Sequence, residues 1–245
     1  MYDVSRKPAR TPIWGEPEPG SRRPSVTREQ IAQAALQIAD ADGLDAVSMR
    51  RVAAELGVGT MTLYHYVRTK DDLYQLMGDS LMGELRVPDD AIDPVDWRSS
   101  ITAIARASRN VFRNHPWMIK AMDQGGEIGP NGFRHFEQSV AAVEGTGLDP
   151  AGKLQFVAIV DDLVFGFALR SAMEELELAN DDWRAKAIAY AEQQLESGDF
   201  PHIKALFGPG DRREQWERIT NQINAADRFE IGLEALLDGL ERRLA

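Results

Sequence analysis

The chain has 245 residues, a formal net charge of −11, no cysteine and four histidines. This length suits one large domain or a small domain joined to a larger one, and no apolar run approaches the roughly 18 residues that cross a bilayer. The lack of cysteine excludes disulfides, thiolate nucleophiles and Cys-ligated zinc. We therefore expect a cytoplasmic protein with no membrane partner, no metal site and no cofactor.

From residue 25 onward the sequence has helical periodicity, and no strand-like alternation competes with it. Thr27 and Gln30 form a capping box that begins a first helix, and Gly43 ends it. A second helix begins after Ser48 and ends at Gly57.

After a turn at Val58 and Gly59, a short helix is predicted over residues 60–67. A second capping box, Thr69 with Asp72, begins a fourth helix that runs toward residue 86. Two short helices joined by a glycine turn are typical of a helix-turn-helix. Residues 25–86 are therefore predicted to form a DNA-binding domain, in which a three-helix head is followed by the fourth helix that leaves it.

The helix over residues 60–67 has two faces. By helical spacing Leu63, Tyr66 and Val67 point inward, while Met61, Tyr64, His65 and Arg68 point outward. Such an outward face is suited to base edges at the N-terminus of a recognition helix, although a helical hairpin with a solvated surface gives the same pattern.

The charge distribution is compatible with DNA binding. Residues 48–70 carry four basic residues and one acidic residue, whereas residues 87–245 carry 17 basic and 27 acidic residues. Phosphate neutralisation needs clustered Lys and Arg, and the basic cluster coincides with the predicted helix-turn-helix. Charge alone does not exclude an acidic enzyme.

Residues 87–245 are also predicted to be helical. The helix over residues 150–176 is apolar nearly all round, which indicates burial or a subunit interface, and a last helix covers about 213–244. Residues 197–211 are interpreted as a loop. The adjacent acids Asp161 and Asp162 interrupt the apolar run, but neighbouring helical residues point about 100° apart and do not converge on one substrate atom.

The stretch LGVGTMTLYHYVRTKDDL resembles the DNA-binding domain of the tetracycline-repressor (TetR) family, and FRNHPWM and FEIGLEALLDGLERRL resemble the regulatory domain of the tetracycline-repressor subgroup. The resemblance implies an all-α fold, in which residues 87–245 form a larger ligand-binding and dimerisation domain. It further implies base contacts by Arg50, Thr60, Met61, Thr62 and His65, and phosphate contacts by Ser48, Tyr64 and Lys70. The roles of Arg51 and Arg68, phosphate contact or solvent exposure, stay open.

Residues 1–24 hold five of the twelve prolines and five basic residues, and we interpret them as an extended, largely disordered arm. Arg22 and Arg23 directly precede the first helix. Two interpretations stay open: these side chains enter the minor groove, or they belong to a tail with incidental charge.

The resemblance also bears on the ligand. Two histidines that hold a drug–magnesium complex in the tetracycline repressor correspond to Arg86 and to the neighbourhood of Ala121 and Met122, so magnesium–tetracycline is not the expected effector. Aromatic and methionine side chains of the larger domain are instead candidates to bind a drug-sized lipophilic molecule, although such residues at helical spacing are more often plain core. The favoured candidates are Trp117, Met122, Phe133 and Phe156.

Together with the residues, the resemblance implies a homodimeric repressor that binds a palindromic double-stranded operator and is released by a small lipophilic effector. A transcriptional activator of the same fold stays an alternative. A helical small-molecule-binding protein or enzyme that does not act on DNA is a second one, but no nucleophile–base constellation or phosphate-binding glycine loop supports an enzyme.

Overall fold

The computed structural model describes residues 13–18, 26–122, 128–178, 181–206, 211, 214–215, 218–219, 223 and 227–244. Every regular element within these ranges is a helix, so the expected all-α fold is confirmed. None of these helices is long and apolar enough to cross a membrane. The elements in chain order are η1 (Ile13–Gly15), α1 (Arg28–Asp42), η2 (Leu44–Ala46), α2 (Met49–Glu55), α3 (Thr60–Tyr66), α4 (Lys70–Glu84), η3 (Asp89–Ala91), α5 (Trp97–Asn114), α6 (Met118–Met122), α7 (Pro130–Ala142), η4 (Glu144–Thr146), α8 (Pro150–Leu178), α9 (Asp181–Ser197), α10 (Pro201–Lys204) and α12 (Arg228–Leu244).

The predicted helix starts of the head are confirmed, whereas the last helix, expected over about 213–244, begins at Arg228. The Gln30 amide nitrogen of the backbone donates to the Thr27 hydroxyl, and the Thr27 backbone N–H donates to the Gln30 side chain, which completes the first capping box. Thr69 and Asp72 make the same reciprocal pair at the start of α4. These bonds satisfy backbone donors that have no partner within the helix.

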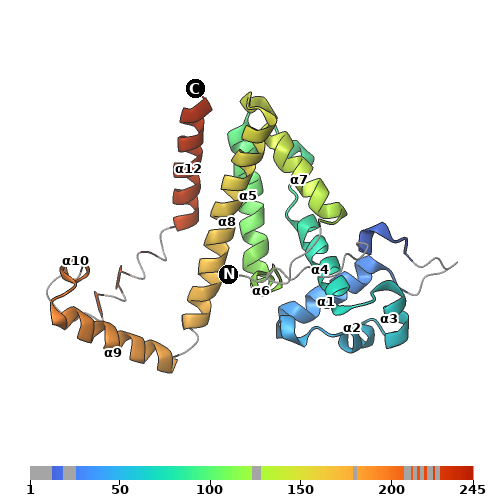
Figure 1. The fold of residues 1–245 in the computed structure, drawn as a ribbon, viewed down its shortest axis with the longest axis horizontal. Helices are drawn as coiled ribbons and strands as arrows, with labels where there is room; N and C mark the ends of the chain where they lie inside the picture. Colours follow the sequence, from blue (N-terminus) through green and yellow to red (C-terminus); the bar gives the residue numbers. More distant parts are fainter. Residues whose placement is uncertain are drawn as a thin grey trace. The chain divides into compact units, whose positions relative to one another are not determined.

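Helices α1, α2 and α3 surround one apolar core at one end of α4 (Figure 1). Its wholly buried members include Ile31 of α1, Val52 of α2 and Leu63 of α3, and Leu73 and Met77 of α4 close it. Because α4 packs closely against α1, the fourth helix is part of the head as well as its exit.

The expectation of disorder over residues 1–24 is wrong for its middle part. Ile13–Gly15 form the short helix η1, and the Ile13 side chain, only 2% exposed, belongs to the same core as α1 and α4. An apolar isoleucine and tryptophan within this proline-rich stretch bury enough surface to order it. The arm residues Arg22 and Arg23 lie outside the described residues.

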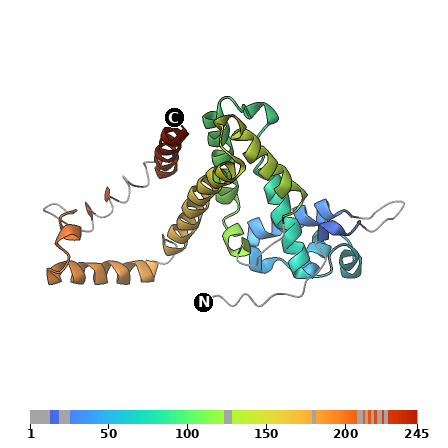
Figure 2. The ribbon, with the colours of Figure 1, turned by 45° about the horizontal axis from the view of Figure 1, so that its top comes forward.

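The chain divides into two compact units, residues 1–158 and 159–245. The domain boundary expected after residue 86 stays a prediction. The first unit extends past residue 86 because the C-terminal half of α4 packs against α7 (Figures 1 and 2). The head and the first helices of the larger region therefore share one unit.

The second unit contains the C-terminal part of α8 together with α9, α10 and α12. The rings of Phe167 on α8 and Phe229 on α12 meet edge to face, with centroids 5.4 Å apart. Arg228 donates to Glu174 of α8 at 2.8 Å. Within the expected loop, Pro201 begins the short helix α10, because proline is well suited to the first helical position.

Candidate DNA-reading head and ligand pocket

Helix α3 presents the face that the sequence predicted. Gly57, with φ of +67°, ends the preceding helix in the left-handed region, and α3 begins after Gly59. Leu63 is fully buried, whereas Met61 is 74% exposed. His65 is exposed as well, so the predicted inward and outward sides are confirmed, while contact with bases stays a prediction.

The other predicted base contacts lie around α3. Thr60 and Thr62, at its N-terminal end, are partly exposed, and Arg50 is exposed at the start of α2. Tyr64, which is expected to contact phosphate, is 45% exposed on the outward side of α3. The residues expected to contact bases are therefore accessible to solvent, at the N-terminal end of α2 and along the outward side of α3.

Two of the predicted phosphate contacts also have structural roles. The Ser48 hydroxyl accepts the Arg51 backbone N–H at 3.3 Å and caps α2. Lys70, at the first position of α4, holds its ammonium 5.2 Å from the centre of the Tyr74 ring. A cation over an aromatic face keeps most of its charge available, so Lys70 is still suited to a phosphate.

The two arginines whose roles were open are both in ion pairs. Arg51 pairs with Asp42 at the end of α1. Arg68, just after α3, lies 2.6 Å from a carboxylate oxygen of Glu16 and 3.6 Å from one of Asp72. Neither side chain is simply solvated.

The expected ligand residue Trp117 lies instead at the junction of the head with the α5–α6 turn. Its indole Nε1 donates to Asp40 of α1 at 2.7 Å, and Nδ1 of His115 lies 2.7 Å from the same oxygen. The other nitrogen of His115 lies 3.2 Å from Glu84 at the end of α4. Trp117 is only 8% exposed and belongs to the core of the head.

A second junction holds α7 to α4. One carboxylate oxygen of Asp79 accepts the backbone N–H groups of Asn131 and Gly132 at 2.9 and 3.0 Å, at the start of α7. Burial raises the pKa of Asp79 above its usual range, although these two amides oppose the shift. Just beyond the C-terminal end of α4, the Gln138 side chain both accepts from and donates to the backbone of Val87.

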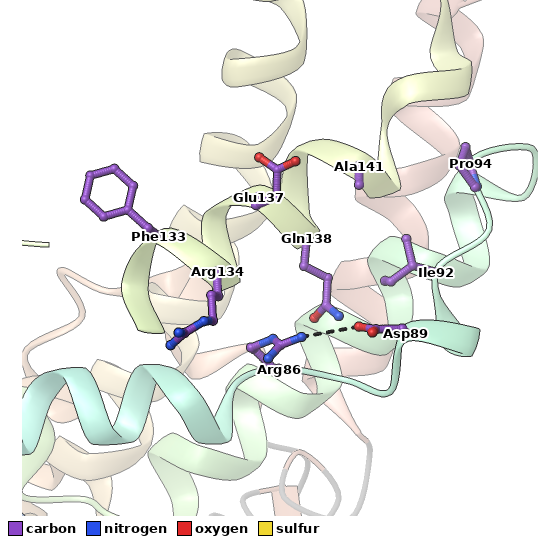
Figure 3. A pocket seen from close by; sticks show the side chains of 9 residues that line it. All are labelled: Arg86, Asp89, Ile92, Pro94, Phe133, Arg134, Glu137, Gln138 and Ala141. Atoms are coloured by element: carbon purple, nitrogen blue, oxygen red, sulfur yellow. Dashed lines mark hydrogen bonds and ion pairs between the residues drawn. The ribbon is translucent and has the colours of Figure 1, made fainter. Parts of the chain in front are cut away.

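Between this junction and η3 lies a pocket of about 650 Å³ (Figure 3). Its wall combines apolar side chains with two arginines, two acids and an amide, and α7 supplies more than half of it. The lining residues are Arg86, Asp89, Ile92, Pro94, Phe133, Arg134, Glu137, Gln138 and Ala141.

Among the expected ligand residues whose side chains the structure describes, Phe133 lines this pocket, and Trp117 and Phe156 do not. Its ring is 62% exposed and turns away from the other labelled side chains (Figure 3). Phe156 is buried against Trp97, with centroids 5.3 Å apart and the rings nearly perpendicular. Met122 ends α6, and its side chain lies outside what the structure describes.

The polar wall was missed by the sequence reasoning, although one signal was present. Arg86, where the resemblance implied a drug-binding histidine, does line the pocket and pairs with Asp89 at 3.3 Å. A position equivalent to a known ligand contact could therefore have pointed to this site even though the residue type differs.

A helix-turn-helix with an accessible second helix, carried by a helical body with a pocket, defines the class of DNA-binding regulators. The family described as bacterial regulatory proteins of the tetR family matches residues 31–77, and the tetracyclin repressor-like C-terminal domain matches residues 91–244. The chain belongs to the TetR family. It is therefore a DNA-binding transcriptional regulator and not an enzyme.

Individual relatives agree with this assignment. The chain is 33% identical to the HTH-type transcriptional repressor DrrR1 of Streptomyces coeruleorubidus over 252 residues, which cover 98% of this chain and 83% of that protein. Apo ActR from Streptomyces coelicolor superposes with a TM-score of 0.67 at 28% identity and covers 90% of this chain and 96% of its own. ActR in complex with actinorhodin gives a TM-score of 0.65, also at 28% identity, and covers 88% of this chain and 95% of its own.

Proposed function

We propose that the protein is a homodimeric cytoplasmic repressor that reads a palindromic operator with α3 of each protomer. The observation that carries this proposal is the accessible face of α3, where Met61 and His65 are exposed while Leu63 is fully buried beneath them. A helix fixed from one side can hold its other side in the major groove.

Footprinting on DNA that flanks the protein's own gene tests the operator. A protected palindrome at moderate salt is expected, and its absence would contradict the proposal. Arg50→Ala should relax sequence preference, whereas Lys70→Ala should weaken binding to all sequences alike. Identical behaviour of the two variants would show that their division into base and phosphate contacts is wrong. A reporter placed downstream of the palindrome separates repression from activation.

The dimer is proposed to form through α8 and α12. Leu169 and Met173 on α8 and Ile231 on α12 are large apolar side chains left exposed in a single chain. Large apolar surface of this kind is typical of a subunit interface. Met173→Glu should shift the sedimentation equilibrium toward the monomer, whereas Val95→Glu, at a site 89% exposed before α5, should not.

The effector is proposed to be a small lipophilic molecule that binds the pocket beside α7. Ile92, Pro94 and Ala141 supply its apolar wall, and Arg86 and Arg134 would accommodate an acidic or hydrogen-bond-accepting group. The actinorhodin complex of ActR makes actinorhodin the first compound to test by thermal shift.

Release from the operator is proposed to be a shift between two conformations. Half-sites engage together only when the two recognition helices are roughly 34–36 Å apart. An effector that prefers another separation weakens DNA binding by its differential affinity, and a thousandfold release needs about 4 kcal/mol. Helix α4 is suited to transmit the change, because it packs against α1 of the head and against α7 of the pocket.

Two phenylalanines on α7 provide a matched test of the pocket. Phe133→Ala should weaken the response to the effector, because Phe133 lines the pocket. Phe136→Ala removes an exposed ring from the same helix outside the lining and should leave the response unchanged. Equal responses of both variants would place the effector elsewhere.

A further inference from the structure

The segment Ile13–Glu16, which we call the strap, is attached to the end of the recognition helix. One Nη atom of Arg28 donates to the carbonyl oxygens of Ile13 and Glu16, both at 2.8 Å. Nε of the same guanidinium donates to the carbonyl oxygen of Tyr66, the last residue of α3, at 3.4 Å. One side chain therefore fixes the strap beside the C-terminal end of α3.

This attachment places an acid against a basic residue of the DNA-reading head. Glu16 lies 2.6 Å from Arg68, and the two side chains are 39% and 40% exposed. Ion pairs that are open to water to this extent are weak and exchange partners readily. Arg68, two residues beyond α3 and on its predicted outward side, can therefore pass from the Glu16 carboxylate to another anion.

The strap also reaches α7. A Cβ atom built on Gly129, the residue that precedes α7, would lie 2.7 Å from Cε2 of Trp14 and 2.3 Å from Oδ1 of Asp79. Only glycine allows this close approach of the strap, α4 and the start of α7. The helix that forms most of the pocket wall is thus in contact with the segment that carries Glu16.

We propose that Arg68 is a further phosphate contact of the head and that Glu16 of the strap competes with DNA for it. In the free protein Glu16 holds Arg68, and on DNA the carboxylate and a phosphate compete for it, so the wild-type head makes this phosphate contact in only part of its complexes. Trp14 keeps the strap in place against α7, so the start of the pocket helix helps to set how firmly Arg68 is held. This inference rests on the proposed DNA-binding function and adds a second connection between pocket and head beside α4.

The first test measures affinity for a duplex of random sequence over a range of salt concentrations. Glu16→Gln should bind more tightly and steepen the dependence of log K on log salt by up to about 0.9 for each head, because it completes a phosphate contact that the wild type makes only in part. Adding Arg68→Gln should abolish this gain. Glu18→Gln is the control, because it removes the same charge from an acid that contacts only the Arg28 backbone N–H in the described hydrogen bonds.

Two results would overturn the proposal. One is a salt slope in Glu16→Gln no steeper than that of Glu18→Gln, and the other is a gain that persists when Arg68 is replaced. The Glu16 side chain is partly exposed, so its substitution is not expected to impair folding, and circular dichroism verifies this. A protein that binds no DNA at all would contradict the proposed function instead, so the two failures are distinguishable.

The second test concerns the link to α7. Trp14→Ala should give part of the Glu16→Gln gain, and Arg68→Gln should abolish that part as well. Amide hydrogen exchange of the head verifies that the variant is folded. If Trp14→Ala keeps the wild-type salt slope while Glu16→Gln steepens it, the strap acts within the head alone and the proposed connection to α7 is wrong.

Discussion

The hydrogen bond from Trp117 to Asp40 joins the α5–α6 turn to the first helix of the head, and Trp117→Phe removes the donor while it keeps an aromatic ring. A hydrogen bond to a charged group contributes about 1.5–3 kcal/mol to stability. The Asp40 side chain is 37% exposed, so water replaces part of the bond and the lower value applies. The smaller ring adds about 1 kcal/mol of lost packing, which gives a total near 2.5 kcal/mol.

Thermal unfolding followed by circular dichroism measures this loss. For a chain of this size each kcal/mol lowers Tm by about 2–4 °C, so Trp117→Phe should melt about 5–10 °C below the wild type. In a double-mutant cycle with Asp40→Ala, the two substitutions should be coupled by about 1.5 kcal/mol. Asp45→Ala, an exposed acid of the same head, is the control and should show no coupling. Additive effects of the Trp117 and Asp40 substitutions would refute the reasoning.

Two further expectations concern burial and charge in the unit formed by residues 1–158. Leu63→Ala should lower the free energy of unfolding by about 2–5 kcal/mol in urea titrations, whereas Met61→Ala, 74% exposed, should leave it unchanged and alter operator preference in binding assays. Because burial raises the pKa of Asp79, its protonated form stabilises the fold at low pH, and this contribution is lost as pH rises through the raised pKa. The unfolding free energy of Asp79→Asn relative to the wild type should therefore increase as pH rises above about 4, and a flat difference between pH 4 and 7 would contradict it.

The head could be predicted from the sequence because the interactions that define it are local. The capping boxes at Thr27 and Thr69 each join residues three apart, and the outward side of α3 follows from the helical repeat alone. The helical repeat also places Leu63 on the inward side of α3, where it is buried. The partners of Arg51 and Arg68 could not be predicted in this way, because Asp42 and Glu16 are brought to them by packing of separate segments.

The pocket was predicted less well because the sequence reasoning gave priority to large apolar residues. Tryptophan and phenylalanine stabilise a fold most when they are buried. Accordingly, Trp117 is buried and donates a hydrogen bond to Asp40, and Phe156 packs against Trp97. A pocket wall is formed by the side chains of a helix that do not pack into the core. On α7 that face includes Arg134 and Gln138, which no local pattern distinguishes from a solvated surface.

The strap shows how an average over composition can hide an ordered element. Over residues 1–24, proline and basic residues dominate and favour disorder, yet Ile13 and Trp14 are enough to anchor three residues on a core that other helices have already formed. Arg28, which holds this segment, is 15 positions away from Ile13 and donates to the backbone carbonyl oxygen of Ile13. The pattern of side chains near residue 13 therefore does not predict this contact. A backbone contact made at such a distance is determined by the fold. Two adjacent apolar residues in a polar arm can therefore be ordered by burial on the core that the following helices form, even where the composition of the arm favours disorder.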